Sequence, residues 1–171
     1  MPSHTYGTFT KALAAGKLES AYYFLGAENV LKDEATTALL DKVLDPGLRD
    51  FNLDIRSAQQ LEPEDVLSLC TTLPMMADRR VVVVRDVEAW KRKTRGKKAV
   101  LEYLEKPIPE TLLVLVQGAA SDAKDDKPDT DLAKHAYTIA FAELTVEEAT
   151  RWVAREAKSM GITFAPGAEA H

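Results

Sequence analysis

Cysteine is nearly absent from this sequence, and two other features that mark special classes of protein are missing as well. The one cysteine, Cys70, has no second cysteine with which to form an intramolecular disulfide, which is typical of a reducing cytoplasm. No apolar run approaches the roughly 20 residues that span a bilayer. Residues 1–4 lack the charged-then-apolar pattern of a secretory signal. We therefore expect a cytoplasmic globular protein.

The charge balance excludes one class of partner. The 22 basic and 27 acidic residues give a net charge of −5. A surface that wraps DNA as a whole would need an excess of positive charge, although a local basic patch remains compatible with this balance. The hydrophobic fraction of 46% and the length of 171 residues are sufficient for one α/β domain with a small appendage.

Constellations that carry catalysis or bind metals are also missing. The histidines, His4, His135 and His171, are scattered, and with a single cysteine they give no metal-ligand spacing. No Gly-x-Ser-x-Gly motif is present. His135 favours a surface or helix-end position, and Cys70, on the apolar side of a predicted helix, favours the core. The sequence predicts no catalytic residue, cofactor or metal.

Strand and helix patterns alternate along the chain. Five segments predict strands, because they are apolar runs or alternate between apolar and polar residues: 21–25, 51–56, 81–84, 112–116 and 137–141. Helices are predicted around residues 9–16, 31–43, 63–73, 100–104 and 145–161. This alternation predicts a three-layer α/β fold with a mostly parallel, five-stranded sheet.

The end of the chain differs from the rest. Residues 121–131, rich in aspartate, predict a solvated loop. Thr145 and Glu148 have the spacing of a capping box, and Gly161 is placed to end the helix that they begin. We expect one domain over residues 1–143, followed by a helix that leads into a small, truncated helical domain over 144–171.

A first strand, a glycine and a helix form the usual setting of a phosphate-binding loop. A working loop needs several glycines, a lysine for the phosphates and a Ser or Thr for magnesium. Here the turn contains only Gly26, places Glu28 where phosphate would approach, and follows Lys32 with Asp33. The sequence therefore predicts that this turn does not bind nucleotide.

The strand over residues 81–84 shows a matching defect. A strand of this type ends in an acidic pair that holds Mg²⁺ in nucleotide-hydrolysing proteins. Arg85 occupies the first acidic position and only Asp86 follows. We infer a degenerate nucleotide site; the alternative is a small ATPase or phosphotransferase with an atypical phosphate loop.

A basic segment follows this strand. Six of its eight residues are positive: Lys91, Arg92, Lys93, Arg95, Lys97 and Lys98. The ordinary interpretation is a solvated loop between a strand and a helix. The alternative is a DNA-facing site, since phosphate contacts require only well-placed cations. Trp90 beside the segment favours packing against the sheet edge over stacking on a base.

Three apolar residues stand next to charged ones after the predicted helix at 63–73. Leu73, Met75 and Met76, which we call the apolar tip, flank Pro74 and precede Asp78-Arg79-Arg80. Proline should end the helix and project the following side chains, and methionine adapts readily to a partner's pocket. From this pattern alone, burial of both methionines beneath the sheet is the commoner outcome.

Several of these segments resemble the delta subunit family of the bacterial DNA polymerase III clamp loader. The similarity is carried by residues 21–28 with the following helix, by 51–55, and most specifically by 67–84; residues 145–161, with Arg151-Trp152-Val153, are similar as well. Family members are about twice as long as this chain. The chain thus resembles the first domain and the edge of the second, without the C-terminal domain that assembles the loader.

The resemblance implies an AAA+-like fold, of the P-loop NTPase type, with no functional nucleotide site. It further implies a non-catalytic subunit of the polymerase holoenzyme whose partner is the sliding clamp, the beta subunit. An apolar wedge before a β-strand enters a pocket on the clamp and helps to open the ring for loading onto DNA. Other loader subunits would be contacted through the C-terminal region, and DNA only indirectly.

The positions that match the family's wedge are Met75 and Met76, with Leu73 one step behind. Family members often have a leucine-phenylalanine type of pair here. The two methionines preserve the apolar volume but lack the aromatic ring.

Overall fold

A six-stranded parallel sheet organises the first of the two units into which the chain divides, Met1–Phe141 and Ala142–His171. The computed structural model describes residues 4–91, 93–118 and 127–162. The strand order is β1-β6-β2-β5-β4-β3, and every pairing among the described strands is parallel. The predicted three-layer α/β fold is confirmed, with one strand more than expected. The strands are β1 (His4–Thr5), β2 (Ala21–Leu25), β3 (Leu53–Ser57), β4 (Arg80–Arg85), β5 (Thr111–Val116) and β6 (Tyr137–Ala140).

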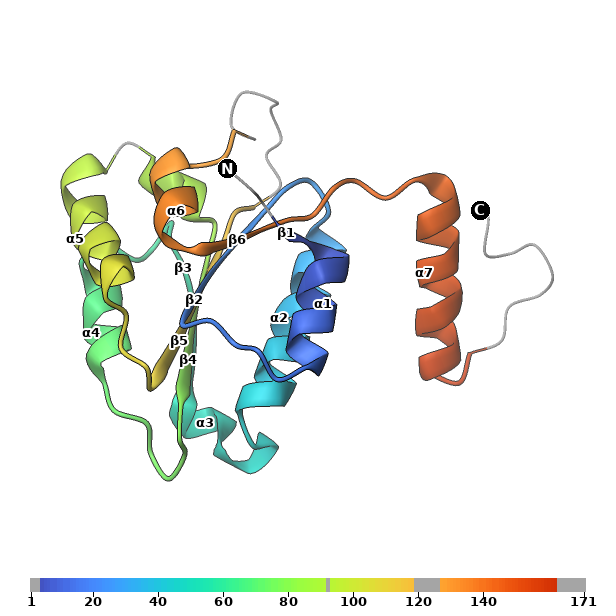
Figure 1. Ribbon diagram of the computed structural model, residues 1–171, viewed down its shortest axis with the longest axis horizontal. Helices are drawn as coiled ribbons and strands as arrows, with labels where there is room; N and C mark the ends of the chain where they lie inside the picture. The colour runs from blue at the N-terminus through green and yellow to red at the C-terminus, as the bar shows by residue number, and fades with distance from the viewer. Residues whose placement is uncertain (1–3, 92, 119–126, 163–171) are drawn as a thin grey trace. The chain divides into compact units, whose positions relative to one another are not determined.

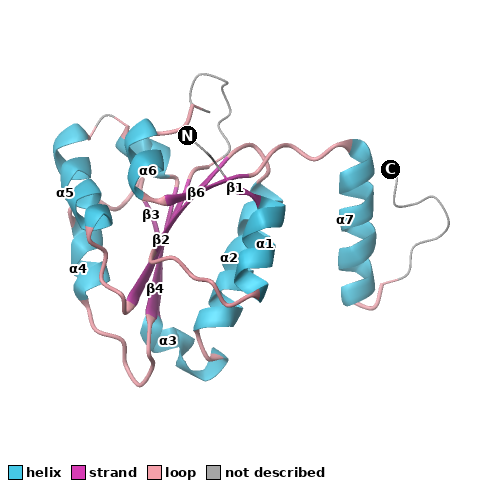
Figure 2. Cartoon of the chain, in the orientation of Figure 1, coloured by secondary structure: helices cyan, strands magenta, loops and turns pink. Residues whose placement is uncertain are grey.

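Helices cover both faces of this sheet, as Figures 1 and 2 show. On one face lie α1 (Tyr6–Ala14) and α2 (Asn29–Val43), and on the other lie α4 (Asp65–Thr71), α5 (Thr94–Glu105) and α6 (Thr130–His135). Short helical turns fill two connections: η1 (Pro46–Leu48) runs into α3 (Arg49–Asn52), and η2 (Val87–Trp90) follows β4.

The central strands are buried on both faces. Every residue of β5 is buried, as are the four consecutive valines of β4. On one face, Tyr22 and Phe24 pack against Phe9 of α1, with ring centroids 5.8 and 5.7 Å apart in edge-on geometry. On the other face, side chains of β2, β4 and β5 share a core with α4, α5 and α6: Tyr23, Val82, Val84, Leu113, Leu115, Val66, Cys70, Val100, Leu104 and Leu132.

The strand predicted over residues 51–56 needs correction in its start and in which of its side chains face the core. The strand expected over residues 51–56 begins only at Leu53, because residues 49–52 form α3. The apparent alternation had suggested that Phe51 points inward, yet 54% of it is exposed, while its polar neighbour Asn52 is fully buried. A buried amide must find hydrogen-bond partners, and those partners lie far along the chain.

Two further elements were absent from the prediction. Strand β1 has only two residues and pairs with β6 at the sheet edge, so it leaves no apolar pattern in the sequence. Helix α6 begins where a solvated loop was expected over residues 121–131, of which 121–126 lie outside the described residues. Asp129 is buried and caps α6 by accepting hydrogen bonds from the main-chain N–H groups of Asp131 and Leu132.

The second unit contains α7 (Val146–Ser159). The predicted capping box is present: the N–H of Glu148 donates to Thr145 Oγ1 at 3.3 Å, and the N–H of Thr145 donates to Glu148 Oε2 at 2.9 Å. Gly161 has a left-handed φ of +71°, as expected at the end of a helix. Among the described residues, no helix combines the length and apolar character needed to cross a membrane.

Substitution of Gly26, which directly follows β2, should lower the stability of the fold. Its φ is +112°, and a Cβ there would lie 2.2 Å from the main-chain oxygen of Phe141. A close backbone contact of this kind costs about 1–3 kcal/mol and a glycine-only conformation a similar amount. We expect Gly26→Ala to lower the free energy of unfolding by about 2–6 kcal/mol, as measured by urea denaturation.

Gly16→Ala provides a matched control. Gly16 also has a positive φ, +72°, but nothing lies within 4 Å of the position that a Cβ would take there. This control should lose only about 1–2 kcal/mol, the cost of a left-handed L residue. Equal losses in the two variants would show that the contact with Phe141 is unimportant.

Candidate functional site

The apolar tip lies on the connection between α4 and β4, which we call the tip loop (residues 72–79). The exposed fractions are 76% for Leu73, 52% for Met75 and 75% for Met76. Burial of the methionines beneath the sheet, the commoner outcome for such a pattern, is thus wrong for this chain. Exposed methionines and leucine close together in sequence are characteristic of surfaces that bind another molecule.

The exposure follows from where α4 ends. The last helical residue is Thr71, and Thr72 is already extended, with φ −68° and ψ 128°. The helix therefore stops three residues before Pro74, rather than at the proline as predicted. Val66 and Cys70 bury the apolar side of α4 in the core, while Leu73 lies beyond the last turn.

The tip loop is held at its start and near its middle by two buried polar side chains whose roles the sequence did not predict. Arg80, at the start of β4, is 5% exposed, forms an ion pair with Asp54 on β3, and donates to the main-chain oxygen of Thr72 at 3.5 Å. Asn52 forms hydrogen bonds to the main chain of Met75. In the sequence, Arg80 looks like one of the exposed charged residues that follow the apolar tip, and Asn52 looks like a solvent-facing residue of an alternating strand. Neither pattern indicates a buried residue that holds the loop.

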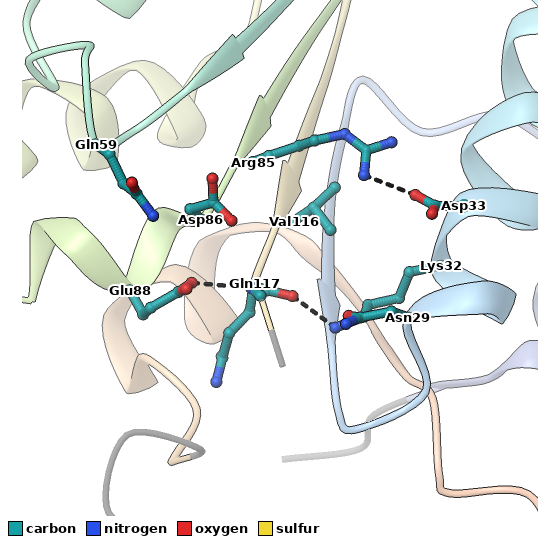
Figure 3. Close-up of a pocket in the computed structure, with 10 residues that line it drawn as sticks. Asn29, Lys32, Asp33, Gln59, Arg85, Asp86, Glu88, Val116 and Gln117 are labelled. Atoms are coloured by element: carbon teal, nitrogen blue, oxygen red, sulfur yellow. Dashed lines mark hydrogen bonds and ion pairs between the residues drawn. The ribbon is translucent and has the colours of Figure 1, made fainter. Parts of the chain in front are cut away.

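A polar cavity of about 340 Å³ lies at the opposite end of the sheet, where the phosphate turn was expected. Its lining comes from the last residues of β4 and β5, from the residues that follow β3, β4 and β5, and from the first half of α2 (Figure 3): Asn29, Lys32, Asp33, Gln59, Arg85, Asp86, Glu88, Val116, Gln117 and Gly118. The cavity lies about 20 Å from the tip loop, the length of the six-residue strand β4.

Lys32, the residue that would meet phosphate, is bound to the protein's own backbone. It is 1% exposed, and its Nζ donates to the main-chain oxygen of Gly26 at 2.8 Å. It also donates to the main-chain oxygen of Gln117 at 2.6 Å (Figure 3). These two carbonyls belong to the turn after β2 and to the end of β5. The ammonium therefore ties two strand ends together.

Two residues that depart from the usual phosphate-binding pattern, Asp33 and Arg85, form an ion pair with each other. Arg85 Nη1 lies 2.6 Å from Asp33 Oδ1, so the residue at the magnesium-binding hydroxyl position pairs with the residue at the first acidic position (Figure 3). Glu88 accepts a hydrogen bond from the N–H of Gly118 at 2.9 Å and adds negative charge to the cavity. The three carboxylates outnumber the two cations of the cavity, which disfavours phosphate.

The basic segment is not a solvated loop. Residues 94–98 form the first turns of α5, and Lys97 is 8% exposed, with Nζ 2.9 Å from Asp129 and 3.2 Å from Asp131. Burial lowers the pKa of Lys97, but the hydrogen bonds to Asp129 and Asp131 and the attraction of both carboxylates together outweigh it, so the pKa is raised overall. Lys97 is therefore removed as a DNA-facing candidate, because its charge is already neutralised.

The other basic candidates have different surroundings. Lys93 forms an ion pair with Glu62 at 2.6 Å, while Arg95 and Lys98 are exposed. Lys91 is partly exposed, and Arg92 lies outside the described residues. Trp90, fully buried, donates from Nε1 to the main-chain oxygen of Leu61 at 2.9 Å and cannot stack on a base.

The remaining reactive residue types have structural roles. Cys70 is fully buried, and burial raises the pKa of its thiol to about 12, so it stays protonated and unreactive. His4 stacks on Tyr137 at 4.1 Å, and His135 Nδ1 lies 2.9 Å from the main-chain oxygen of Asp131; His171 is outside the described residues. Within the described residues, no cluster of three potential ligands could hold a metal ion.

Comparison with known proteins places these features in a family. A family model described as DNA polymerase III, delta subunit, matches residues 22–142. The DNA polymerase III subunit delta of Bacillus subtilis is 28% identical over 167 residues, covering 94% of this chain and 48% of that protein. The chain thus spans about half the length of this relative.

Comparison with solved structures gives the same family. The Bacillus subtilis DNA clamp loader delta protein YqeN superimposes with a TM-score of 0.72 at 25% identity, covering 97% of this chain and 51% of that one. Thermotoga maritima RuvB, at 14% identity and a TM-score of 0.60, covers 95% of this chain and 51% of its own and shares the fold alone.

Lys32 gives a test of whether the altered phosphate turn is structural. Lys32→Met keeps the chain length but leaves the carbonyls of Gly26 and Gln117 without this donor. A buried acceptor without a partner costs about 1–3 kcal/mol, so we expect the free energy of unfolding to fall by about 2–4 kcal/mol. Urea denaturation of this variant, with Lys42→Met at the exposed end of α2 as control, measures the difference. If both variants were as stable as the wild type, Lys32 would not be a structural tie.

Proposed function

The chain belongs to the DNA polymerase III delta subunit family, and from this premise we propose that it binds the ring-shaped DNA sliding clamp through the apolar tip. In this proposal Leu73, Met75 and Met76 enter an apolar pocket on the clamp and help to open the ring for loading onto DNA. The observation that carries the proposal is the exposure of all three side chains on a loop whose main chain is held at Thr72 and at Met75.

The free energy available from this contact is adequate for a specific complex. Burying one large apolar side chain contributes about 1.5–3 kcal/mol. Two methionines that are 52% and 75% exposed in the free protein have most of this contribution still to gain. Methionine side chains are flexible and adapt to the shape of a pocket. Two methionines can therefore occupy a pocket that accepts a leucine-phenylalanine pair, although their shapes differ.

The proposed subunit is non-catalytic. Support comes from the cavity at the carboxyl ends of the strands, where Lys32 binds main-chain oxygens and Asp33 pairs with Arg85. Phosphate would have to displace these contacts while approaching Glu88. A loader subunit that only grips the clamp needs no nucleotide chemistry of its own, since other subunits can supply it. In this proposal, contacts with the other loader subunits are made by the part of the delta subunit that the relatives have and this chain does not span.

The proposal assigns no second function to the basic segment. Of the six candidates, Lys97, Lys93 and Lys98 form ion pairs, the last of them with Glu102 at 3.6 Å. Arg95 and Lys98 remain exposed, but two exposed cations on a helix are ordinary surface residues.

Substitution of the two methionines tests the proposed grip. We expect Met75→Ala with Met76→Ala to weaken binding to the purified clamp by about 10²–10⁴-fold, the equivalent of two lost apolar anchors. Calorimetric titration of the chain with the clamp measures the dissociation constant. The stability of the chain should hardly change, because neither side chain is part of the core.

Met160→Ala is the matched control, since Met160 is 71% exposed but lies in the second unit. Its dissociation constant should equal that of the wild type. Unchanged binding by the double variant would contradict the assignment of the apolar tip.

Nucleotide titration separates the proposal from the enzyme alternative. We expect no saturable heat when Mg-ATP is titrated into the chain up to millimolar concentration, because the phosphate turn is occupied by internal contacts. Micromolar affinity for Mg-ATP would instead support an ATPase or phosphotransferase.

A further inference from the structure

Asn52, the last residue of α3, makes a pair of hydrogen bonds to one residue of the tip loop. Its Oδ1 accepts from the main-chain N–H of Met75 at 2.7 Å, and its Nδ2 donates to the main-chain oxygen of Met75 at 2.9 Å. A third bond from Nδ2 reaches the main-chain oxygen of Leu48 at 3.1 Å. The side chain is fully buried.

We propose that Asn52 is a positioning residue that fixes the main chain of Met75 and so presents the apolar tip to its partner. The inference rests on the proposed function, because the partner is the sliding clamp. Asn52 itself is buried, so it has no surface with which to contact the clamp. Its effect must pass through the loop.

The chemistry of the side chain fits this role. An amide offers one acceptor and two donors in a planar group, so it can pair with both the N–H and the C=O of one residue, as a neighbouring strand would. Aspartate would offer only acceptors, and leucine neither. Because the tip loop has no strand beside it at Met75, this side chain supplies both of the main-chain hydrogen bonds found there.

The conformation of the next residue requires such a constraint. Met76 is one of two residues other than glycine with positive φ among the described residues, at +51°. A left-handed conformation is unfavourable for an L residue and persists where its surroundings fix it. The bonds from Asn52 fix the residue before Met76, and the contacts of Arg80 with Asp54 and Thr72 fix the base of the loop.

A loop that is fixed before binding loses less conformational entropy when it binds. Without Asn52, the methionines would remain exposed and chemically unchanged, but the loop would sample other conformations. The fraction of molecules that could bind would fall, and the apparent dissociation constant would rise in proportion.

A double-mutant cycle with the methionines tests this role. We expect Asn52→Ala to raise the dissociation constant for the purified clamp about tenfold, the scale of ordering one or two residues. In a chain that already carries Met75→Ala and Met76→Ala, the same substitution should have no further effect. Asn52→Asp, which keeps the acceptor for the Met75 N–H, should fall between Asn52→Ala and the wild type.

Amide hydrogen exchange gives a second measurement that needs no clamp. In Asn52→Ala, exchange at the main-chain N–H of Met75 should be at least about tenfold faster, because its acceptor has been removed. Tyr23→Phe serves as the control. It removes buried hydrogen bonds to Gln117 and Asp129 at the other end of the sheet, so it perturbs stability without altering exchange at Met75 or clamp binding.

Each outcome supports or overturns the inference. Unchanged exchange at Met75 in Asn52→Ala overturns it, whatever the clamp does. So does a loss of affinity that persists undiminished in the methionine double variant, since Asn52 would then act elsewhere. If the double variant alone binds as well as the wild type, the proposed function fails first, and the exchange data still decide whether Asn52 fixes the loop.

Discussion

Burial of strands β2, β5 and β4 on both faces is the constraint on which the other features depend. Parallel strands require crossover connections, and the helices of those connections cover the two faces of the sheet. The central strands therefore reach solvent only through the loops at their ends. One end carries the altered phosphate turn and the other carries the tip loop, with the length of β4 between them. The same scaffold keeps a structural cavity at one end and presents apolar side chains at the other.

In the altered phosphate turn, the charges of two unusual residues, Asp33 and Arg85, compensate each other. Aspartate at position 33 beside an acidic strand end would create repulsion, and so would arginine at position 85 beside the Mg²⁺ ion that such a site holds. Together they form an ion pair, 56% and 39% exposed, which contributes little to stability, about 0–1 kcal/mol, but cancels both charges. Lys32 is the stronger structural element, because its ammonium is buried and binds two carbonyl groups. A site of this chemistry holds the strand ends together, and the exposed apolar side chains lie at the opposite end of the sheet.

The tip loop combines exposed apolar side chains with buried polar anchors, the reverse of the usual arrangement. Leu73, Met75 and Met76 point to solvent, while Asn52 and Arg80 lie inside and hold the loop by hydrogen bonds and an ion pair. The anchors have a clear physical reason. Apolar side chains exposed on a flexible loop would collapse onto the nearest apolar surface of their own chain, whereas a fixed backbone keeps them available to a partner.

The sequence by itself determined the features that arise between near neighbours. The apolar runs of β2, β4 and β5, the end of α2 at Val43 and the capping box of α7 are all local patterns, and the defects of the phosphate turn follow from residue types at known spacings. Only the tertiary structure decided that Asn52 lies inside, that Lys97 pairs with Asp129, and that β1 joins the sheet. These contacts join residues far apart in the chain, such as the 23 positions between Asn52 and Met75 and the 32 between Lys97 and Asp129. A hydrogen bond of this kind leaves no periodicity in sequence, because its partners are brought together only by the packing of the elements that carry them.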